Sequence, residues 1–356
     1  MDLIPGLPND VALDCLIRVP FNQFPIAASV CRGWKVEIEM PEFRQLRKAV
    51  GLSRSISVMA QARVDPTRNH RGGLKVSATP VYRLTVCDPE TSIWWELPPV
   101  PGLSDGLPVF CQLVGVGSEL VVMGGCSPVT WEASNSVFIY NFVLAKWRRG
   151  ADMPGGRRLF FACASDSDRT VFVAGGHDDD KNALRSAMAY AVVEDKWVPM
   201  PDMARERDEC KGLFHDGKFH VIGGFCTEMQ GRFESSAEAF DIATWQWGEV
   251  QEDFFDAATC PRTCVDGGDG RIIMCREGNV MAIKDGNWQV IAGLPAEVSN
   301  AAYVSTWQGK LLAIGCANFG EPHIAYVMDL KDQTWTKVEI SEEFTGHVQS
   351  GCFIEI

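Results

Sequence analysis

The chain has 356 residues, of which 46% are hydrophobic and 22% charged, and its formal net charge is −13. This length allows a large buried core, and the acidic balance argues against nucleic acid as a partner, because phosphates would be repelled. The opening Met1-Asp2 lacks the basic region of a secretion signal, and no apolar run approaches membrane-spanning length. We therefore expect a cytoplasmic or nuclear protein, or one present in both, with no membrane partner.

The first fifty residues favour helices. Pro8 stands at a plausible first helical position, and Asn9 and Asp10 fall in the first turn, where such residues suit a helix N-terminus. A second helix is expected over 26–35, and a third apolar stretch runs to Leu46. A segment this short buries little surface alone, so its uncovered apolar side chains predict a docking partner.

The rest of the chain repeats one pattern, an apolar strand that ends in a glycine pair. The clearest pairs begin at Gly124, Gly175 and Gly223, so the period is roughly 50 residues, which is typical of a kelch-type β-propeller with four short strands per unit. Glycine permits positive φ where strand ends crowd the axis, and a Trp in each unit is expected to fill the gap between blades. Six units are marked in this way, by Trp94, Trp147, Trp197, Trp247, Trp288 and Trp335.

Both ends of the repeat array are incomplete. The first unit lacks an innermost strand before Ile56, and residues 347–356 form an apolar strand with no unit after it. We therefore predict a six-bladed all-β propeller over 49–356 that is closed by the C-terminal strand, preceded by an α-helical domain over 1–48. Such closure would hide two strand edges that otherwise template aggregation.

Residues with catalytic or metal-binding chemistry are scattered. The thirteen cysteines include no Cys-x-x-Cys pair, which favours free thiols in a reducing compartment over a zinc site. The six histidines and five tyrosines are spread over different units, and no Gly-x-Ser-x-Gly motif occurs. We expect no catalytic residue, no metal and no cofactor.

Three short motifs follow one another in the helical segment: Leu7-Pro8-x-Asp10-Val11, Leu16-x-Arg18 and Val30-Cys31-Arg32-x-Trp34. In order and spacing they resemble an F-box, the helical motif that docks on the Skp adaptor of cullin-based ubiquitin ligases. The resemblance implies that the adaptor, and through it cullin, is a partner. It also implies which residues contact the adaptor or hold the contacting helices in place: Leu7, Pro8, Val11, Leu16, Val30 and Trp34.

The opening residues 1–8 and the stretch 60–66 look like those of plant F-box/kelch proteins, within which they most resemble the group called KISS ME DEADLY. The resemblance implies a non-catalytic substrate receptor of an SCF-type (Skp–cullin–F-box) E3 ubiquitin ligase, which presents a client for degradation. It leaves two clients open: phenylalanine ammonia-lyase, which would repress phenylpropanoid synthesis, or type-B response regulators, which would repress cytokinin signalling. A kelch scaffold or enzyme that is not engaged in ubiquitination is the alternative of another class.

Arginines gather in the segments that enter each blade and in those that follow the glycine pairs. Both sets of loops lie on one face of a kelch blade, so they are expected to form a positive ring for an acidic client segment, since Arg makes bidentate contacts with carboxylates. The alternative is that they only bond carbonyls of neighbouring loops. The set comprises Arg157, Arg158, Arg185, Arg205, Arg207, Arg232, Arg262 and Arg276.

Overall fold

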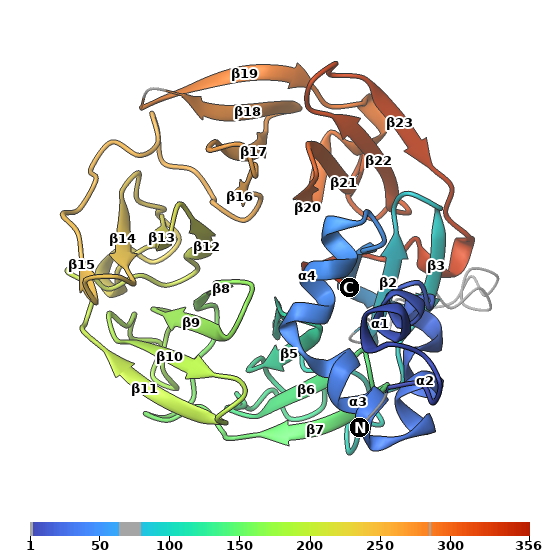
Figure 1. Cartoon of the computed structure of the whole chain (residues 1–356). Helices are drawn as coiled ribbons and strands as arrows, with labels where there is room; N and C mark the ends of the chain where they lie inside the picture. The colour runs from blue at the N-terminus through green and yellow to red at the C-terminus, as the bar shows by residue number, and fades with distance from the viewer. Residues whose placement is uncertain (1–2, 64–79, 285) are drawn as a thin grey trace.

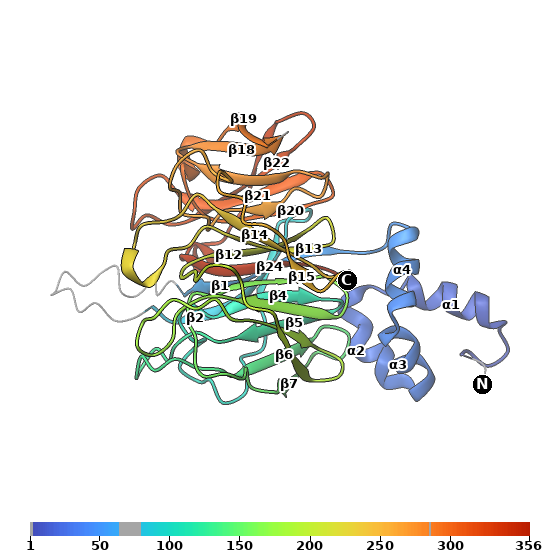
Figure 2. The ribbon, with the colours of Figure 1, turned by 90° about the vertical axis from the view of Figure 1, so that its left-hand side faces the viewer.

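The computed structural model describes residues 3–63, 80–284 and 286–356. These residues form a ring of six four-stranded antiparallel sheets with a helical domain on one face (Figure 1 and Figure 2). The predicted six-bladed propeller with N-terminal helices is therefore confirmed. No helix among the residues described is long and apolar enough to span a membrane.

The helical domain contains four α-helices and one 3₁₀ turn. They are α1 (Asn9–Ile17), η1 (Phe21–Gln23), α2 (Phe24–Val30), α3 (Arg32–Glu39) and α4 (Pro41–Ala49). The single helix predicted over 26–35 was wrong, because Cys31 is extended (φ −159°, ψ 164°) and separates α2 from α3. The Cys31 sulfur accepts a hydrogen bond from the Trp34 backbone N–H at 3.4 Å, so Cys31 caps the N-terminus of α3.

Each blade runs from an inner strand at the axis to an outer strand at the rim. Blade 1 contains β24 (Val348–Glu355), β1 (Ser55–Ala62), β2 (Tyr82–Asp88) and β3 (Ile93–Glu96). Blade 2 contains β4 (Gln112–Val116), β5 (Glu119–Met123), β6 (Val137–Asn141) and β7 (Lys146–Gly150). Blade 3 contains β8 (Ala162–Ser165), β9 (Thr170–Ala174), β10 (Ala187–Ala191) and β11 (Lys196–Met200).

The second half of the ring repeats this order. Blade 4 contains β12 (Lys211–His215), β13 (Lys218–Ile222), β14 (Ala237–Asp241) and β15 (Gln246–Trp247). Blade 5 contains β16 (Val265–Asp266), β17 (Ile272–Arg276), β18 (Asn279–Lys284) and β19 (Asn287–Gly293). Blade 6 contains β20 (Asn300–Trp307), β21 (Lys310–Cys316), β22 (Ile324–Asp329) and β23 (Trp335–Val338).

The glycine pairs have the predicted conformation. Gly124 and Gly125 have φ of 66° and 79°, in the left-handed region that favours glycine. A Cβ on Gly125 would lie 2.7 Å from both the Cys111 nitrogen and the Val109 carbonyl oxygen. The second glycine therefore lets one blade's strand end approach the segment that enters the same blade.

The six marker tryptophans join consecutive blades around the rim. Each lies on the outermost strand of its blade, with a partly buried ring. Each indole N–H donates to a backbone carbonyl of the preceding blade's outer segment, at 2.7 to 3.0 Å. The acceptors, in order from Trp94 to Trp335, are the carbonyls of Glu339, Pro98, Ala151, Pro201, Phe254 and Gly293. The predicted packing between blades is thus accompanied by a repeated polar contact.

The C-terminal strand closes the ring, as predicted. β24 pairs antiparallel with β1, with Ile56 opposite Ile354 and Val58 opposite Cys352. The pairing extends beyond the strands, because Arg54 and Ile356 exchange backbone hydrogen bonds of 2.7 and 2.8 Å. Blade 1 therefore combines the first and last strands of the propeller.

The same strand helps to seat the helical domain. Leu16 and Phe43 of the helices share one hydrophobic cluster with Ile354 and Ile356. At the surface of this junction, the Lys48 ammonium lies 2.6 Å from a Glu355 carboxylate oxygen. The helices are therefore packed on the propeller and are not tethered to it by a linker alone.

Arg47 of α4 fixes this junction from inside. Its side chain is 3% exposed and lies 4.8 Å from the centre of the Phe24 ring. Its guanidinium donates to the carbonyls of Ile17, Val19 and Leu52, so one side chain joins the end of α1 to the segment that leads into β1. Burial lowers the pKa of Arg47 from its usual value.

Deleting residues 347–356 should destabilise the entire ring, because the edge of β1 and the cluster shared with the helices both become exposed. Thermal unfolding of the truncated chain should show a lower Tm than the full chain. A truncated protein that melts at the wild-type temperature would argue against closure by β24.

Candidate functional site

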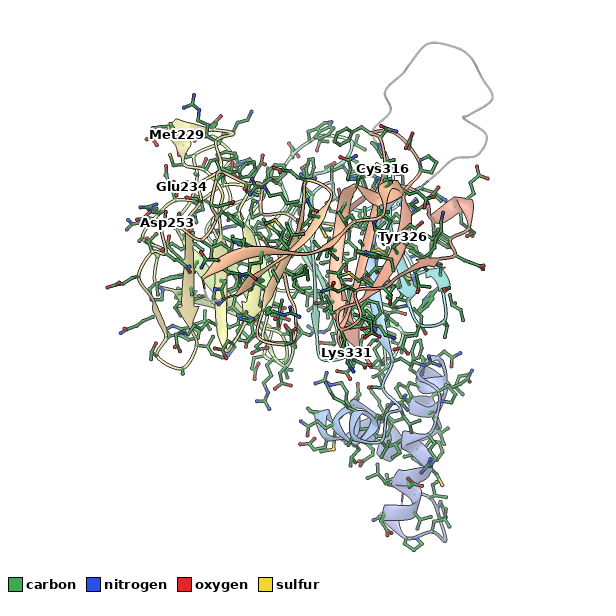
Figure 3. The ribbon with its side chains drawn as sticks, turned by 90° about the horizontal axis from the view of Figure 1, so that it is seen from above. Met229, Glu234, Asp253, Cys316, Tyr326 and Lys331 are labelled. Carbon is green, nitrogen blue, oxygen red and sulfur yellow. The ribbon has the colours of Figure 1, made fainter. Side chains whose placement is uncertain are left out.

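Two surfaces on opposite faces of the propeller are candidates for binding. In blades 2 to 6, the loop between the second and third strands and the loop that leads to the next blade lie on the face away from the helices. In Figure 3, Met229 and Cys316 lie on this distal face, whereas Lys331 lies beside the helical domain. We call the distal face, which carries Met229 and Cys316, the loop face. The opposite face, which carries Lys331 and the helical domain, is the helix face.

The helical domain exposes an unusual number of large apolar side chains. Their exposed fractions range from 38% at Leu7 to 63% at Ile26. Apolar side chains uncovered at this density in a small domain indicate a protein-docking surface. The exposed set is Leu7, Val11, Ile26, Val30, Val36, Met40, Leu46 and Val50.

The six residues predicted for this surface fall into two groups. Leu7, Pro8, Val11 and Val30 are exposed and available for contact. Leu16 is 1% exposed and lies inside the shared core. Trp34 is partly buried, and its indole N–H donates to the Leu3 carbonyl at 2.6 Å, so it holds the N-terminal segment against α3. Sequence reasoning did not single out Ile26, Val36, Met40, Leu46 or Val50.

All eight predicted arginines lie on the loop face, but two of them are buried. Arg158 is 2% exposed and donates to the carbonyls of Gly175 and Ser186. Arg207 is fully buried, and its Nε lies 3.1 Å from a Glu238 carboxylate oxygen. Both therefore hold the loops together and present no surface to a partner, which corrects the expectation of direct contact for these two.

Three of the other six arginines, two of them partly buried, already have acidic partners. Arg205 lies 3.2 Å from Glu234 and 2.6 Å from Glu252, and Arg185 lies 3.2 Å from Asp202. Arg276 lies 2.9 Å from Asp256 and 3.2 Å from Glu277. Only Arg157, Arg232 and Arg262 are exposed and without an ion pair among the residues that the structure describes. Among the eight predicted arginines, free positive charge is therefore limited to these three, and Lys181 in the loop between β9 and β10 adds a further exposed cation to this face.

The loop face also carries exposed apolar tips that the sequence analysis missed. Phe319 is 92% exposed, Val129 69%, and Trp131 56%. Phe110, with a φ of 63°, packs against Phe160 at a ring-centroid distance of 4.7 Å. Phe319, Val129 and Trp131 stand in the loops that follow β21 and β5, where the repeat predicts no apolar residue. Phe110 and Phe160 occupy equivalent positions of two blades, each with a positive φ, but no motif marked these positions as exposed. The face therefore combines unpaired arginines with apolar side chains.

Groups with reactive chemistry are sparse among the described residues. Glu206, Cys226 and Glu228 have side-chain ligand atoms within 4.8 Å of one another, but they form a surface acidic cluster. All thirteen cysteines are free. Burial raises the pKa of Cys111 and Cys264 to about 12, so these thiols stay protonated and are poor nucleophiles.

Replacing Arg207 with Leu should destabilise the chain by about 3–5 kcal/mol, because it leaves the buried Glu238 carboxylate without its cation. Replacing the exposed Arg157 with Leu should change stability by no more than about 0.5 kcal/mol. Urea unfolding of both variants measures the difference. Equal effects would contradict the assignment of Arg207 to the scaffold.

Known proteins similar to this chain agree with the fold. The Kelch motif model matches residues 109–154 and 158–204. F-box/kelch-repeat protein At1g80440 of Arabidopsis thaliana is 51% identical over 363 residues, covering all of both chains. F-box/kelch-repeat protein At1g15670 of the same plant is 50% identical over 359 residues, again over the full length of both. F-box/kelch-repeat protein At2g44130 is 36% identical over 282 residues, covering 73% of this chain and 68% of the relative.

Proposed function

Because the chain belongs to the F-box/kelch-repeat proteins, we propose that it is the substrate-receptor subunit of an SCF-type E3 ubiquitin ligase. The observation that carries the proposal is the apolar surface of the F-box helices, which is uncovered although the same helices share a core with the propeller. In this role the helix face binds the Skp adaptor and, through it, cullin. The loop face is left free for a client.

The receptor acts by position and carries out no chemical step. Holding a client near the ubiquitin-loaded enzyme raises the effective concentration of the client's lysines. A flexible joint would dilute that effect, and the Arg47 contacts with three carbonyls oppose such motion. The fixed F-box thus defines where a client on the loop face is presented.

We propose phenylalanine ammonia-lyase as the client, with type-B response regulators as the alternative. This choice rests on the similarity of residues 1–8 and 60–66 to the KISS ME DEADLY group. The loop face suits a segment that combines carboxylates with apolar side chains, since Arg157 borders one hollow with the exposed Val129 and Arg262 borders another with Phe110. Clients of these kinds place the receptor in the cytoplasm, the nucleus or both.

Replacing Leu7 and Pro8 together with Ala should abolish adaptor binding. Both side chains are exposed, so their loss should leave the propeller folded. Pull-down of the purified adaptor measures binding, and an unchanged Tm shows that the fold is intact. Adaptor recovery at the wild-type level would show that this surface is not the docking site.

Reversing the charge of the three unpaired arginines, as Arg157→Glu, Arg232→Glu and Arg262→Glu combined, should weaken client capture about tenfold. Adaptor binding should be unchanged, and client binding by the wild type should be more sensitive to salt than binding by the variant. Lys331→Glu is the matched control, because Lys331 lies on the helix face (Figure 3). Equal loss in both variants would contradict recognition through the loop face.

Client identity is decided by degradation assays with each candidate. Phenylalanine ammonia-lyase should be captured by the chain and should accumulate when the receptor is removed. If neither candidate binds and neither accumulates, the client assignment fails even where adaptor binding is retained.

A further inference from the structure

One lysine lies inside the central channel of the propeller. Lys211 begins β12, the inner strand of blade 4, and pairs in register with Ile222 of β13. It lines a cavity of about 150 Å³ at the loop face, together with Phe110, Phe160 and Arg262. It also lines a cavity of about 650 Å³ that Arg44 and Lys48 of α4 border at the helix face. Lys211 therefore lies inside the channel, between the cavity at the loop face and the cavity at the helix face.

The Lys211 ammonium has no partner among the residues that the structure describes. No carboxylate lies within ion-pair distance and no hydrogen-bond acceptor is assigned to it, in contrast to Lys218 of the next strand, whose ammonium lies 3.9 Å from Asp241. The side chain keeps some accessible surface, but the surrounding walls desolvate it. This desolvation lowers the pKa of Lys211, to which the nearby Arg262 also contributes. A desolvated charge without a counter-ion is costly for the fold.

Titratable side chains of both signs surround Lys211 in the channel. Glu209 and Arg262 line the same mouth, and burial together with the charge of Asp208 raises the pKa of Glu209 although the charge of Arg262 opposes the rise. His347 also lines the mouth, and burial lowers its pKa, which favours the neutral ring. The thiol of Cys163 beside Lys211 has a raised pKa and stays neutral. None of these described groups lies within ion-pair distance of the Lys211 ammonium.

We propose that the channel mouth is a binding site for a carboxylate, which pairs with the Lys211 ammonium and places its apolar body against Phe110 and Phe160. The two rings pack at 4.7 Å between centroids, and Phe110 is 39% exposed, so they offer an apolar wall at the entrance. A cavity of about 150 Å³ suits a group the size of one side chain or a small organic acid. The same chemistry can come from an acidic side chain of the client or from a free carboxylate, and the client source rests on the proposed function.

The first arm of the test uses acetate on the full chain. At equal ionic strength, acetate should raise the Tm above that in chloride, and this gain should vanish in Lys211→Met. In protein with ¹³C-methylated lysines, the Lys211 signal should shift with acetate until saturation and its pKa should rise. Lys218, which is exposed and paired, serves as the internal control. Absence of both the Tm gain and a saturable Lys211 shift overturns the site.

The second arm identifies the source of the carboxylate. Lys211→Met should reduce capture of phenylalanine ammonia-lyase about tenfold or more, and acetate should compete with capture by the wild type. Unchanged capture, together with acetate binding in the first arm, assigns the site to a free carboxylate. Adaptor pull-down separates the carboxylate site from the proposed ligase role. If the wild type binds the adaptor but shows no response to acetate, the site is refuted and the ligase role is unaffected.

Discussion

The antiparallel pairing of β24 with β1 is the constraint on which the rest of the structure depends. It joins the two ends of the propeller, so blade 1 has four strands like the other five sheets and β1 is paired on both sides. It also carries Ile354 and Ile356 into the cluster that contains the F-box core. The same C-terminal strand therefore both closes the ring and packs against the F-box, although it is far from β1 and from the helices in sequence.

This arrangement separates the two candidate binding functions in space. The F-box occupies one face because β1 begins there, and antiparallel order within each blade then sends the long loops to the opposite face (Figure 2). Packing occupies the blades themselves, through the marker tryptophans and the strands between them. Variation in the loops is thus free to change the client without disturbing the adaptor contact.

Features that repeat along the chain could be predicted from the sequence. The spacing of the glycine pairs and tryptophans is set by blade geometry. The unpaired terminal strand at 347–356 could be assigned to the first blade, because that unit lacked an inner strand. The break at Cys31 was missed because no Pro interrupts 26–35 and the one glycine there, Gly33, lies inside α3 beyond the break. The extended residue is recognised only by its cap on Trp34.

The loop face was predicted less well, for an identifiable reason. Arg158 and Arg207 occupy equivalent positions in consecutive blades, and a residue that repeats with the blade period serves the scaffold. In contrast, Phe319 and Trp131 have no counterpart in other repeats and are exposed. A residue that repeats with the blade period is therefore not by itself evidence of a client-binding position, and the exposure of each side chain has to be read from the structure. Lys211 could not be recognised as isolated, because its lack of a partner depends on the packing of several blades.

Hydrogen exchange of the full chain with and without the purified Skp adaptor tests the central claim most directly. The account predicts slower exchange in α1, α2 and α3 on adaptor binding, and unchanged exchange in the loops that carry Trp131, Met229 and Phe319. Protection of those loops, or no protection in the F-box helices, would contradict the division of the molecule into an adaptor face and a client face.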